Sequence, residues 1–408
     1  MPAIERPAEP EQEPSPQPKI EPRPIHNPII PRNRSRLRKI IPVVLAILLL
    51  LLLAISSIGI TTPKKSISPP PVPSSLRALA QRENFHIGAA VNVQALRTDA
   101  KYRDTLAREF NMVTPENAMK FAAVQPGRHV YTFQDADTIV AFARAHGMQV
   151  RGHNLVWYKV LPSWLTDGNF SRQEAMAILH DHISTVVSHY RGQVTDWDVV
   201  NEGMNYDGTL LNSFWLQTIG PDYIDLAFRW AHEADPQARL FYNDYGGEGL
   251  GRKSDAIYNL VKDLRQRGVS INGVGLQMHV SLDATPDPQG VLANMKRLAA
   301  LGVEVQITEM DVETQDDPRS PQDKLTAEAN LYRDMLSACL AAPNCTAFLM
   351  WGFTDRYSWI PYFTGHPDVP LIFDTSYRPK PAYNALLGVL AQSTRRKRPS
   401  SGGPSSSP

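Results

Sequence analysis

Short apolar runs alternate with longer amphipathic stretches between residues 76 and 392. Each apolar run has the length of a β-strand. Eight such runs predict strands at Phe85–Val91, Met112–Pro115, Gln149–Trp157, Asp196–Val200, Leu240–Asn243, Gly273–Met278, Glu304–Thr308 and Ala347–Trp351. The stretches between them carry apolar residues at helical spacing, so strands and helices alternate along this region.

Two of the predicted helices have clear boundary signals. Residues 135–146 place Ile139, Phe142 and Ala143 on one face, and Gly147 follows as a stop signal. A capping box at residues 171–174 predicts the start of another helix. Eight strand and helix repeats predict an α/β protein with a (β/α)8 barrel over residues 76–392. An open doubly wound sheet also alternates, but it usually has fewer strands.

The ends of the chain differ from this middle part in composition. Residues 1–39 are rich in Pro, Glu and Arg and too poor in apolar residues to form a core, so we expect a disordered tail. Residues 393–408 contain a basic run at residues 395–398, which Ser, Gly and Pro follow, and this composition predicts a second disordered tail.

An uncharged apolar segment, residues 40–60, separates the first tail from the barrel. As a helix it would be about 30 Å long, which is enough to cross the hydrocarbon core of a bilayer. Basic residues are more numerous before it than after it, which predicts a cytoplasmic N-terminus and an extracellular catalytic domain. A cleaved signal peptide and secretion are the alternative, although the run exceeds the roughly 7–15 apolar residues of such signals. The Pro-rich residues 61–75 then predict a stiff linker.

Charge and cysteine content narrow the function classes. The formal net charge is +1, so nothing in the overall electrostatics indicates a nucleic-acid partner. Cys339 and Cys345 are the two cysteines, and outside the cytoplasm such a close pair can form a disulfide. Two buried free thiols are the alternative. His180 and His182 have no further ligand at metal spacing, so neither a metal nor a cofactor is predicted.

Nearly every predicted strand ends in a polar or aromatic cluster. In a (β/α)8 barrel the C-terminal ends of the strands meet on one face, where active sites are built. The clusters are Glu116, Asn117 and Lys120; residues 151–157; Asn201 and Glu202; residues 243–245; Gln277 and His279; Glu309 and Asp311; and Trp351 and Asp355. These clusters predict a long polar cleft at that face.

Two glutamates in these clusters suit the cleavage of a glycosidic bond. This reaction needs a proton donor and a second carboxylate on the other side of the bond, and Glu202 and Glu309 lie at the ends of different strands. Asn201 could bind a sugar hydroxyl, while His279 and Asp311 could hold the Glu309 carboxylate.

Three tryptophans near these strand ends offer flat apolar faces for pyranose rings. They are Trp157, Trp351 and Trp359. Core packing is the ordinary role of a single tryptophan, but their position beside the carboxylates favours sugar binding.

Several motifs together resemble glycoside hydrolase family 10, the family of endo-β-1,4-xylanases. The motifs are PENAMKF from Pro115, RGHNLVW from Arg151, WDVVNE from Trp197, VGLQMH from Val274, ITEMD from Ile307, WGFTDRYSW from Trp351 and FDTSYRPKPAY from Phe373. The resemblance runs from about Leu76 to Leu390. It implies a retaining mechanism, with Glu309 as nucleophile and Glu202 as general acid and base.

The resemblance also implies a set of substrate-binding residues. They are Glu116, Asn117, Lys120, His153, Trp157, Asn201, Gln277, His279, Trp351 and Trp359, to which Tyr245 is added from its strand-end cluster. Cys339 and Cys345 resemble a disulfide of many members. The expected partner is therefore xylan, and the expected catalytic domain is a monomer.

Two positions depart from the pattern of the family. Tyr158, Lys159 and Val160 replace a segment that often carries a sugar-reading amide, and Gly246 and Gly247 stand where Asn and a bulky residue are common. These departures leave β-1,4-glucan or mixed-linkage glucan as alternative substrates. A non-catalytic polysaccharide-binding protein at the cell surface is the alternative from another class, but the chain keeps both glutamates.

Overall fold

The computed structural model describes residues 75–397 of the chain. The predicted N-terminal tail and the predicted helix at residues 40–60 lie outside this range, as do nearly all of the linker and most of the C-terminal tail. Among the helices of residues 75–397, none combines the length and the apolar character needed to cross a bilayer.

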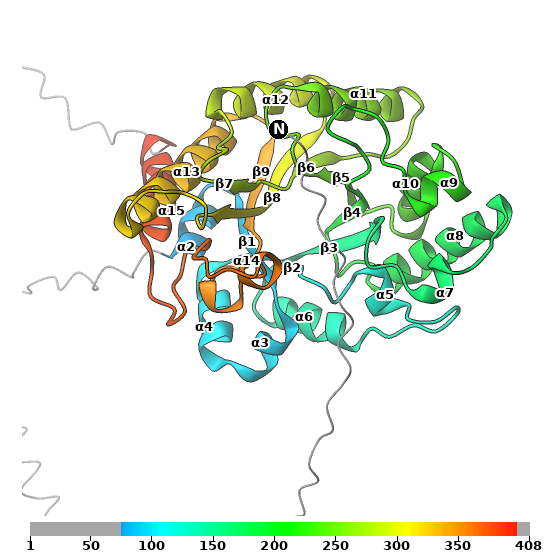
Figure 1. The fold of residues 1–408 in the computed structure, drawn as a ribbon, viewed down its shortest axis with the longest axis horizontal. Helices are drawn as coiled ribbons and strands as arrows, with labels where there is room; N and C mark the ends of the chain where they lie inside the picture. The colour runs from blue at the N-terminus through cyan, green and yellow to red at the C-terminus, as the bar shows by residue number, and fades with distance from the viewer. Residues whose placement is uncertain (1–74, 398–408) are drawn as a thin grey trace, which may run out of the picture. The chain divides into compact units, whose positions relative to one another are not determined.

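The described residues form a parallel barrel inside a ring of helices (Figure 1). The strands are β1 (His86–Val91), β2 (Met112–Pro115), β3 (Gln149–Val156), β4 (Asp196–Asn201), β5 (Arg239–Asp244), β6 (Gly273–Leu276), β7 (His279–Ser281), β8 (Glu304–Glu313) and β9 (Cys345–Met350). Pairing runs β6-β5-β4-β3-β2-β1-β9-β8, and β6 also pairs with β8. This closure confirms the predicted (β/α)8 barrel, since β1–β6, β8 and β9 correspond to the eight predicted strands.

One strand extends further than its apolar pattern indicated. β8 was expected to end at Thr308, but it continues to Glu313, so Glu309 and Asp311 lie within the strand rather than after it. Met310 of β8 pairs with Met350 of β9, and the outer half of β8 pairs with the short strand β7, with His279 opposite Asp311. This pairing places the two side chains beside each other at the rim of the barrel.

The helices follow the strands in the predicted alternation. They are α2 (Leu76–Arg82), α3 (Val93–Thr98), α4 (Ala100–Glu109), α5 (Phe121–Val124), α6 (Gln134–Ala145), α7 (Ser163–Thr166), α8 (Arg172–His189), α9 (Phe214–Thr218), α10 (Tyr223–Ala234), α11 (Arg252–Gln266), α12 (Pro288–Ala300), α13 (Pro321–Ala341), the 3-10 helix η2 (Asp355–Tyr357), α14 (Ile360–Thr364) and α15 (Pro381–Lys397). Both helices with predicted boundary signals are present, and the capping box of Ser171 and Glu174 begins α8.

The last helix extends into the predicted C-terminal tail. The predicted catalytic domain ends at Gln392, whereas α15 continues to Lys397. The helix packs against α13 and α2, and the Ser393 hydroxyl donates a hydrogen bond to Glu83 Oε2 at 3.0 Å. The helix therefore continues past the predicted end of the domain, and Ser393 contacts the residue that follows α2.

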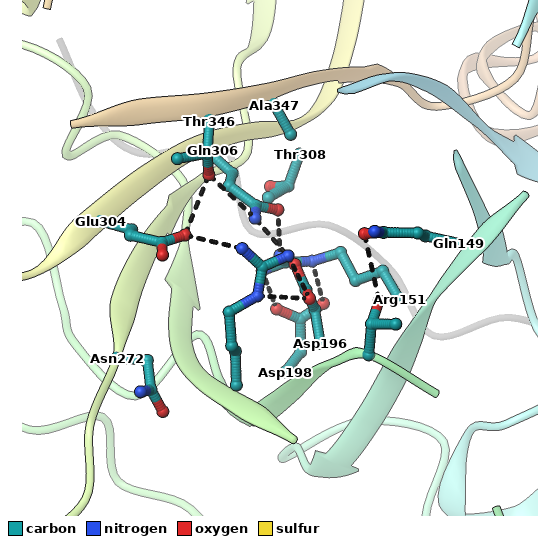
Figure 2. Close-up of polar contacts among 12 residues, drawn as sticks. Gln149, Arg151, Asp196, Asp198, Asn272, Glu304, Gln306, Thr308, Thr346 and Ala347 are labelled. Carbon is teal, nitrogen blue, oxygen red and sulfur yellow. Dashed lines mark hydrogen bonds and ion pairs between the residues drawn. The ribbon is translucent and has the colours of Figure 1, made fainter. Parts of the chain in front are cut away.

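The barrel interior contains a buried polar network (Figure 2). Arg151 of β3 donates to Asp198 of β4 and to Gln306 of β8, and Gln306 donates to Asp196 at 2.7 Å. A side chain at Gly275 of β6 would clash with this polar layer, because its Cβ would lie 2.0 Å from Asn243 Oδ1. Glycine at this position therefore makes room for polar groups inside the barrel.

Candidate active site

The Glu309 carboxylate is buried and held at both oxygens. Asn243 Nδ2 donates to Oε1 at 2.6 Å, and His279 Nε2 donates to Oε2 at 3.1 Å. Thr308 donates to Asn243 Oδ1 at 2.8 Å, which orients the amide so that its nitrogen faces Glu309. The carboxylate is therefore fixed by two donors, one from β5 and one from β7.

The His279 ring lies between two carboxylates. Its Nδ1 donates to Asp311 Oδ1 at 2.8 Å, and Trp359 Nε1 donates to Asp311 Oδ2 at 2.7 Å. Burial opposes the charged form of His279, but Asp311 and Glu309 outweigh it and raise its pKa to about 10. The ring is therefore an imidazolium at neutral pH, with both nitrogens as donors.

Arg151 and Asp198 form a buried charge pair near Glu309. Arg151 binds both oxygens of Asp198, and His153 Nδ1 donates to Asp198 Oδ2 at 2.9 Å (Figure 2 shows the arginine and the aspartate). Burial disfavours the Asp198 carboxylate, but Arg151 and His153 outweigh burial and lower its pKa. His153 Nδ1 also lies 3.9 Å from Glu309 Oε1. The network thus brings a second histidine to the predicted nucleophile.

The two histidines determine the charge state of Glu309. Burial alone would raise its pKa, but His153 and the hydrogen bond from His279 outweigh burial and lower it. His153, Asp198 and Glu309 also bring possible metal-ligand atoms within 4.8 Å of one another. Both oxygens of Asp198 in this group already accept hydrogen bonds, from Arg151 and His153.

Glu202 has a different environment. Its Oε1 lies 3.3 Å from the amide nitrogens of both Asn201 and Gln277. Its Oε2 is buried and has no hydrogen-bond partner among residues 75–397. A small cavity beside the side chain is lined by Trp157, Tyr158, Trp215 and Tyr223. The second oxygen thus has hydrogen-bonding capacity that no protein group among the described residues uses.

The Glu202 backbone is held in an uncommon conformation. Its φ is +55°, in the left-handed region that residues other than glycine rarely adopt. The Glu202 N–H donates to the Asn243 carbonyl at 2.9 Å, and the next N–H, of Gly203, donates to the Tyr242 hydroxyl at 3.0 Å. Tyr242 in turn donates to Asp244 at 2.6 Å. Strand β5 therefore fixes the turn that carries Glu202.

A chain of amides links the two glutamates. Gln277 Nε2 contacts Glu202 and also donates to Asn201 Oδ1 at 3.1 Å. Asn243 Nδ2 donates to the same Asn201 oxygen at 2.8 Å and to Glu309. The structure thus brings together Glu202, Glu309 and the predicted supporting residues at the C-terminal end of the barrel.

Aromatic side chains surround the two carboxylates. Trp351 packs edge-on against His153 and His279, with ring centroids 4.9 and 6.0 Å apart. Trp359 packs against His279 at 5.4 Å. The Trp157 ring nitrogen is buried and has no hydrogen-bond partner in the part of the chain that the structure describes. All three predicted tryptophans thus lie beside the glutamates or the histidines that contact them.

The remaining predicted sugar-binding residues follow the ends of β2 and β5. Lys120 donates to Asn117 Oδ1 at 2.6 Å and lies 5.0 Å from the Trp157 ring centroid. Glu116 is half-buried directly after β2. Tyr245 is half-buried after β5, with Lys253 Nζ 3.9 Å from its ring centroid. These residues therefore follow strands β2 and β5 at the C-terminal end of the barrel.

The two cysteines form a disulfide at the opposite end of the barrel. Cys339 lies near the end of α13, and Cys345 begins β9, whose other end leads to Trp351. The expected disulfide is confirmed, and the alternative of two free thiols is wrong. The bond belongs to the scaffold rather than to the cleft.

Comparison with known proteins identifies the family. The model of glycosyl hydrolase family 10 matches residues 75–389. Endo-1,4-beta-xylanase B of Thermotoga neapolitana is 43% identical over 326 residues, which cover 79% of this chain and 93% of the relative. The chain belongs to glycosyl hydrolase family 10.

Solved structures agree with this assignment to family 10. The crystal structure of a xylanase from Thermotoga petrophila in complex with xylobiose superposes with a TM-score of 0.76 at 42% identity, covering 79% of this chain and 98% of that one. An endo-1,4-beta-xylanase of Penicillium canescens gives 0.75 at 35% identity, with coverages of 78% and 98%.

Part of this family 10 site was not predicted from the sequence. Arg151 and Asn243 were placed in strand-end clusters of the predicted cleft without a role of their own, and Asp198 occurred only within a quoted motif. Their signal was present, because charged or amide residues at alternate positions of apolar strands point into one barrel. The side of the barrel that each would face could not be read without the register of neighbouring strands.

Proposed function

We propose that the chain cleaves internal β-1,4-xylosidic bonds by double displacement, with Glu309 as nucleophile and Glu202 as general acid and base. The chain is an endo-1,4-β-xylanase of family 10. The observation that carries the assignment of roles is the contrast between the two carboxylates: Glu309 accepts from two donors and has a lowered pKa, whereas one Glu202 oxygen has no hydrogen-bond partner among residues 75–397.

In the first step, a Glu309 oxygen bonds to the anomeric carbon while the bond from that carbon to the leaving oxygen breaks. Glu202 gives its proton to the leaving oxygen, so the departing sugar leaves as a neutral alcohol. Asn243 and His279 direct the Glu309 carboxylate during the attack. The product of this step is a xylosyl ester of Glu309.

In the second step, the ionised Glu202 takes a proton from a water molecule, which attacks the anomeric carbon. The bond to Glu309 breaks and its carboxylate is restored. Two inversions give net retention. The low pKa of Glu309 suits both steps, since the same group must be a nucleophile and then a leaving group.

Product stereochemistry and substrate range test this proposal together. Proton NMR of xylohexaose digestion should show the β-anomer first, followed by slow mutarotation. Purified enzyme should release many more reducing ends from xylan than from carboxymethyl cellulose or mixed-linkage glucan. Initial formation of the α-anomer would contradict the double displacement, and equal activity on the glucans would contradict the substrate.

We further propose that residues 40–60 anchor a monomeric catalytic domain outside the cell. This rests on the length and charge asymmetry of that segment. Full-length protein should sediment with membranes, resist an alkaline carbonate wash and be cut by protease added to intact cells. A mature chain lacking residues 40–60 in the culture medium would instead indicate a cleaved signal.

A further inference from the structure

A tight hairpin follows Glu202 and carries an exposed tyrosine at its tip. Met204 and Leu210 pair as an antiparallel bridge, and the Asn205 N–H donates to the Thr209 carbonyl at 2.8 Å. The Gly208 N–H donates back to the Asn205 carbonyl at 3.0 Å. Tyr206 lies inside this turn, and 60% of its surface is exposed. A hairpin held at both its base and its tip presents the ring in a fixed position.

The missing side chain at Gly246 makes this position possible. A Cβ added to Gly246 would lie 2.5 Å from Tyr206 Cε1, and Gly246 has a φ of +66°. The ring of Tyr206 therefore lies directly on the Gly246 backbone. Any side chain at position 246 would displace the ring. Gly246, which departs from the family pattern, therefore leaves the space that the Tyr206 ring occupies.

The side chains of Lys253 and Tyr245 pack beside the Tyr206 ring. Lys253, at the start of α11, is buried and forms an ion pair with Asp244 at 2.8 Å. Its ammonium group lies 3.9 Å from the ring centroid of Tyr245 and 5.1 Å from that of Tyr206. The two rings meet edge-to-face, with centroids 5.7 Å apart. Tyr206 and Tyr245 thus form a stepped aromatic surface beside the turn that carries Glu202.

This surface lies on the leaving-group side of the cleft. Glu202 must reach the leaving oxygen, so the sugar attached to that oxygen lies beside the residues that follow Glu202. Tyr245 directly follows Asp244 and is half-buried, whereas Tyr206 is exposed. A xylosyl ring has an apolar face of C–H bonds that stacks on an aromatic ring.

We propose that Tyr206, seated on Gly246, forms an outer sugar-binding subsite on the leaving-group side. It takes a xylosyl residue beyond the one bonded to the scissile oxygen. The inference rests on the proposed function, because it takes Glu202 as the group that protonates the leaving oxygen. It makes Tyr206 a determinant of where along the xylan chain cleavage occurs.

Two substrates distinguish sugar binding at this subsite from the bond-breaking step at the glutamates. In 4-nitrophenyl β-xylobioside the leaving group is nitrophenolate and carries no sugar, whereas xylohexaose occupies subsites on both sides. We expect Tyr206→Ala to lower kcat/KM for xylohexaose about fivefold to tenfold and to shift its main cleavage position. Its kcat/KM for the aryl xylobioside should stay within about twofold of wild type.

Two further variants control for loss of the fold. Tyr206→Phe keeps the ring and should match wild type on both substrates. Gly246→Asn should reproduce Tyr206→Ala, because asparagine tolerates positive φ but its Cβ displaces the ring. In the double variant the two effects should not add, because both act on one ring.

The outcomes distinguish this inference from the proposed function. If Tyr206→Ala leaves xylohexaose cleavage unchanged, or lowers activity on both substrates equally, the subsite does not exist as proposed. If wild-type enzyme fails to hydrolyse either substrate, the proposed function itself is wrong.

Discussion

Glu309 and Glu202 lie on the same rim of the barrel, but their surroundings differ in how completely the carboxylate is bound. Glu309 accepts from Asn243 and His279, and His153 adds a nearby ring nitrogen. Glu202 has two long amide contacts at one oxygen, and its other oxygen has no partner among residues 75–397. A nucleophile benefits from a fixed, ionised state, whereas a group that gives and takes a proton must keep one oxygen for the substrate.

Replacing Glu309, the carboxylate held by two donors, should have the largest effect on catalysis. Glu309→Ala should lower kcat on the order of 10⁵-fold for xylan and for aryl xylobiosides alike, because no covalent intermediate can form. Steady-state rates on both substrates measure this, with thermal unfolding as the control for the fold. Turnover of either substrate within tenfold of wild type would remove Glu309 from the proposed role.

Replacing Glu202 should affect only reaction steps that need a proton transfer. Glu202→Ala should lower kcat/KM on xylan about 10³-fold, but barely change the first step with 2,4-dinitrophenyl β-xylobioside, which needs no protonation. Added azide should restore turnover and yield the β-xylobiosyl azide. An equal loss on both substrates, with no azide rescue, would contradict the difference between the two glutamates.

Replacing His279, which donates to Glu309, should lower kcat/KM less than the glutamate replacements, and the loss should depend on pH. His279→Gln removes a charged donor to Glu309, so kcat/KM should fall about 10-fold to 100-fold. The pKa of Glu309 should rise, and the acidic limb of the kcat/KM profile should therefore move to higher pH. An unchanged acidic limb would show that His279 does not control the ionisation of Glu309.

The same variant tests the charge of His279 through stability. A histidine titrates near pH 6.5 when unfolded, while His279 has a folded pKa raised to about 10. Its stabilising contribution is thus complete below about pH 6.5 and is lost as pH rises toward 10. Denaturant unfolding should therefore show a gap between wild type and His279→Gln that narrows over this range.

Loss of the disulfide should lower the stability of the barrel without changing catalysis by the two glutamates. Cys339→Ala combined with Cys345→Ala should lower the free energy of unfolding by about 2 kcal/mol, as expected for a short closed loop. The values of kcat and KM should not change at temperatures where the variant is folded. A catalytic loss at those temperatures would mean that the two ends of the barrel are coupled.

The sequence by itself determined the elements of this protein and the residue types of its chemistry. Strand periodicity and the capping box around Ser171 are local properties, so the eight strands and the start of α8 could be predicted. The strand-end clusters placed Glu202 and Glu309 at one face because parallel strands of a barrel end together.

Only the tertiary structure decided how those residues are bound to one another. Arg151 and Gln306 are 155 positions apart, and their hydrogen bond depends on the register of strands that close the barrel. β8 continues past Thr308 and pairs there with β7, and the contact of Tyr206 with Gly246 joins two separate loops. Local pattern carries no information on such register and loop contacts, because each is set by atoms that meet only after the chain has closed into a barrel.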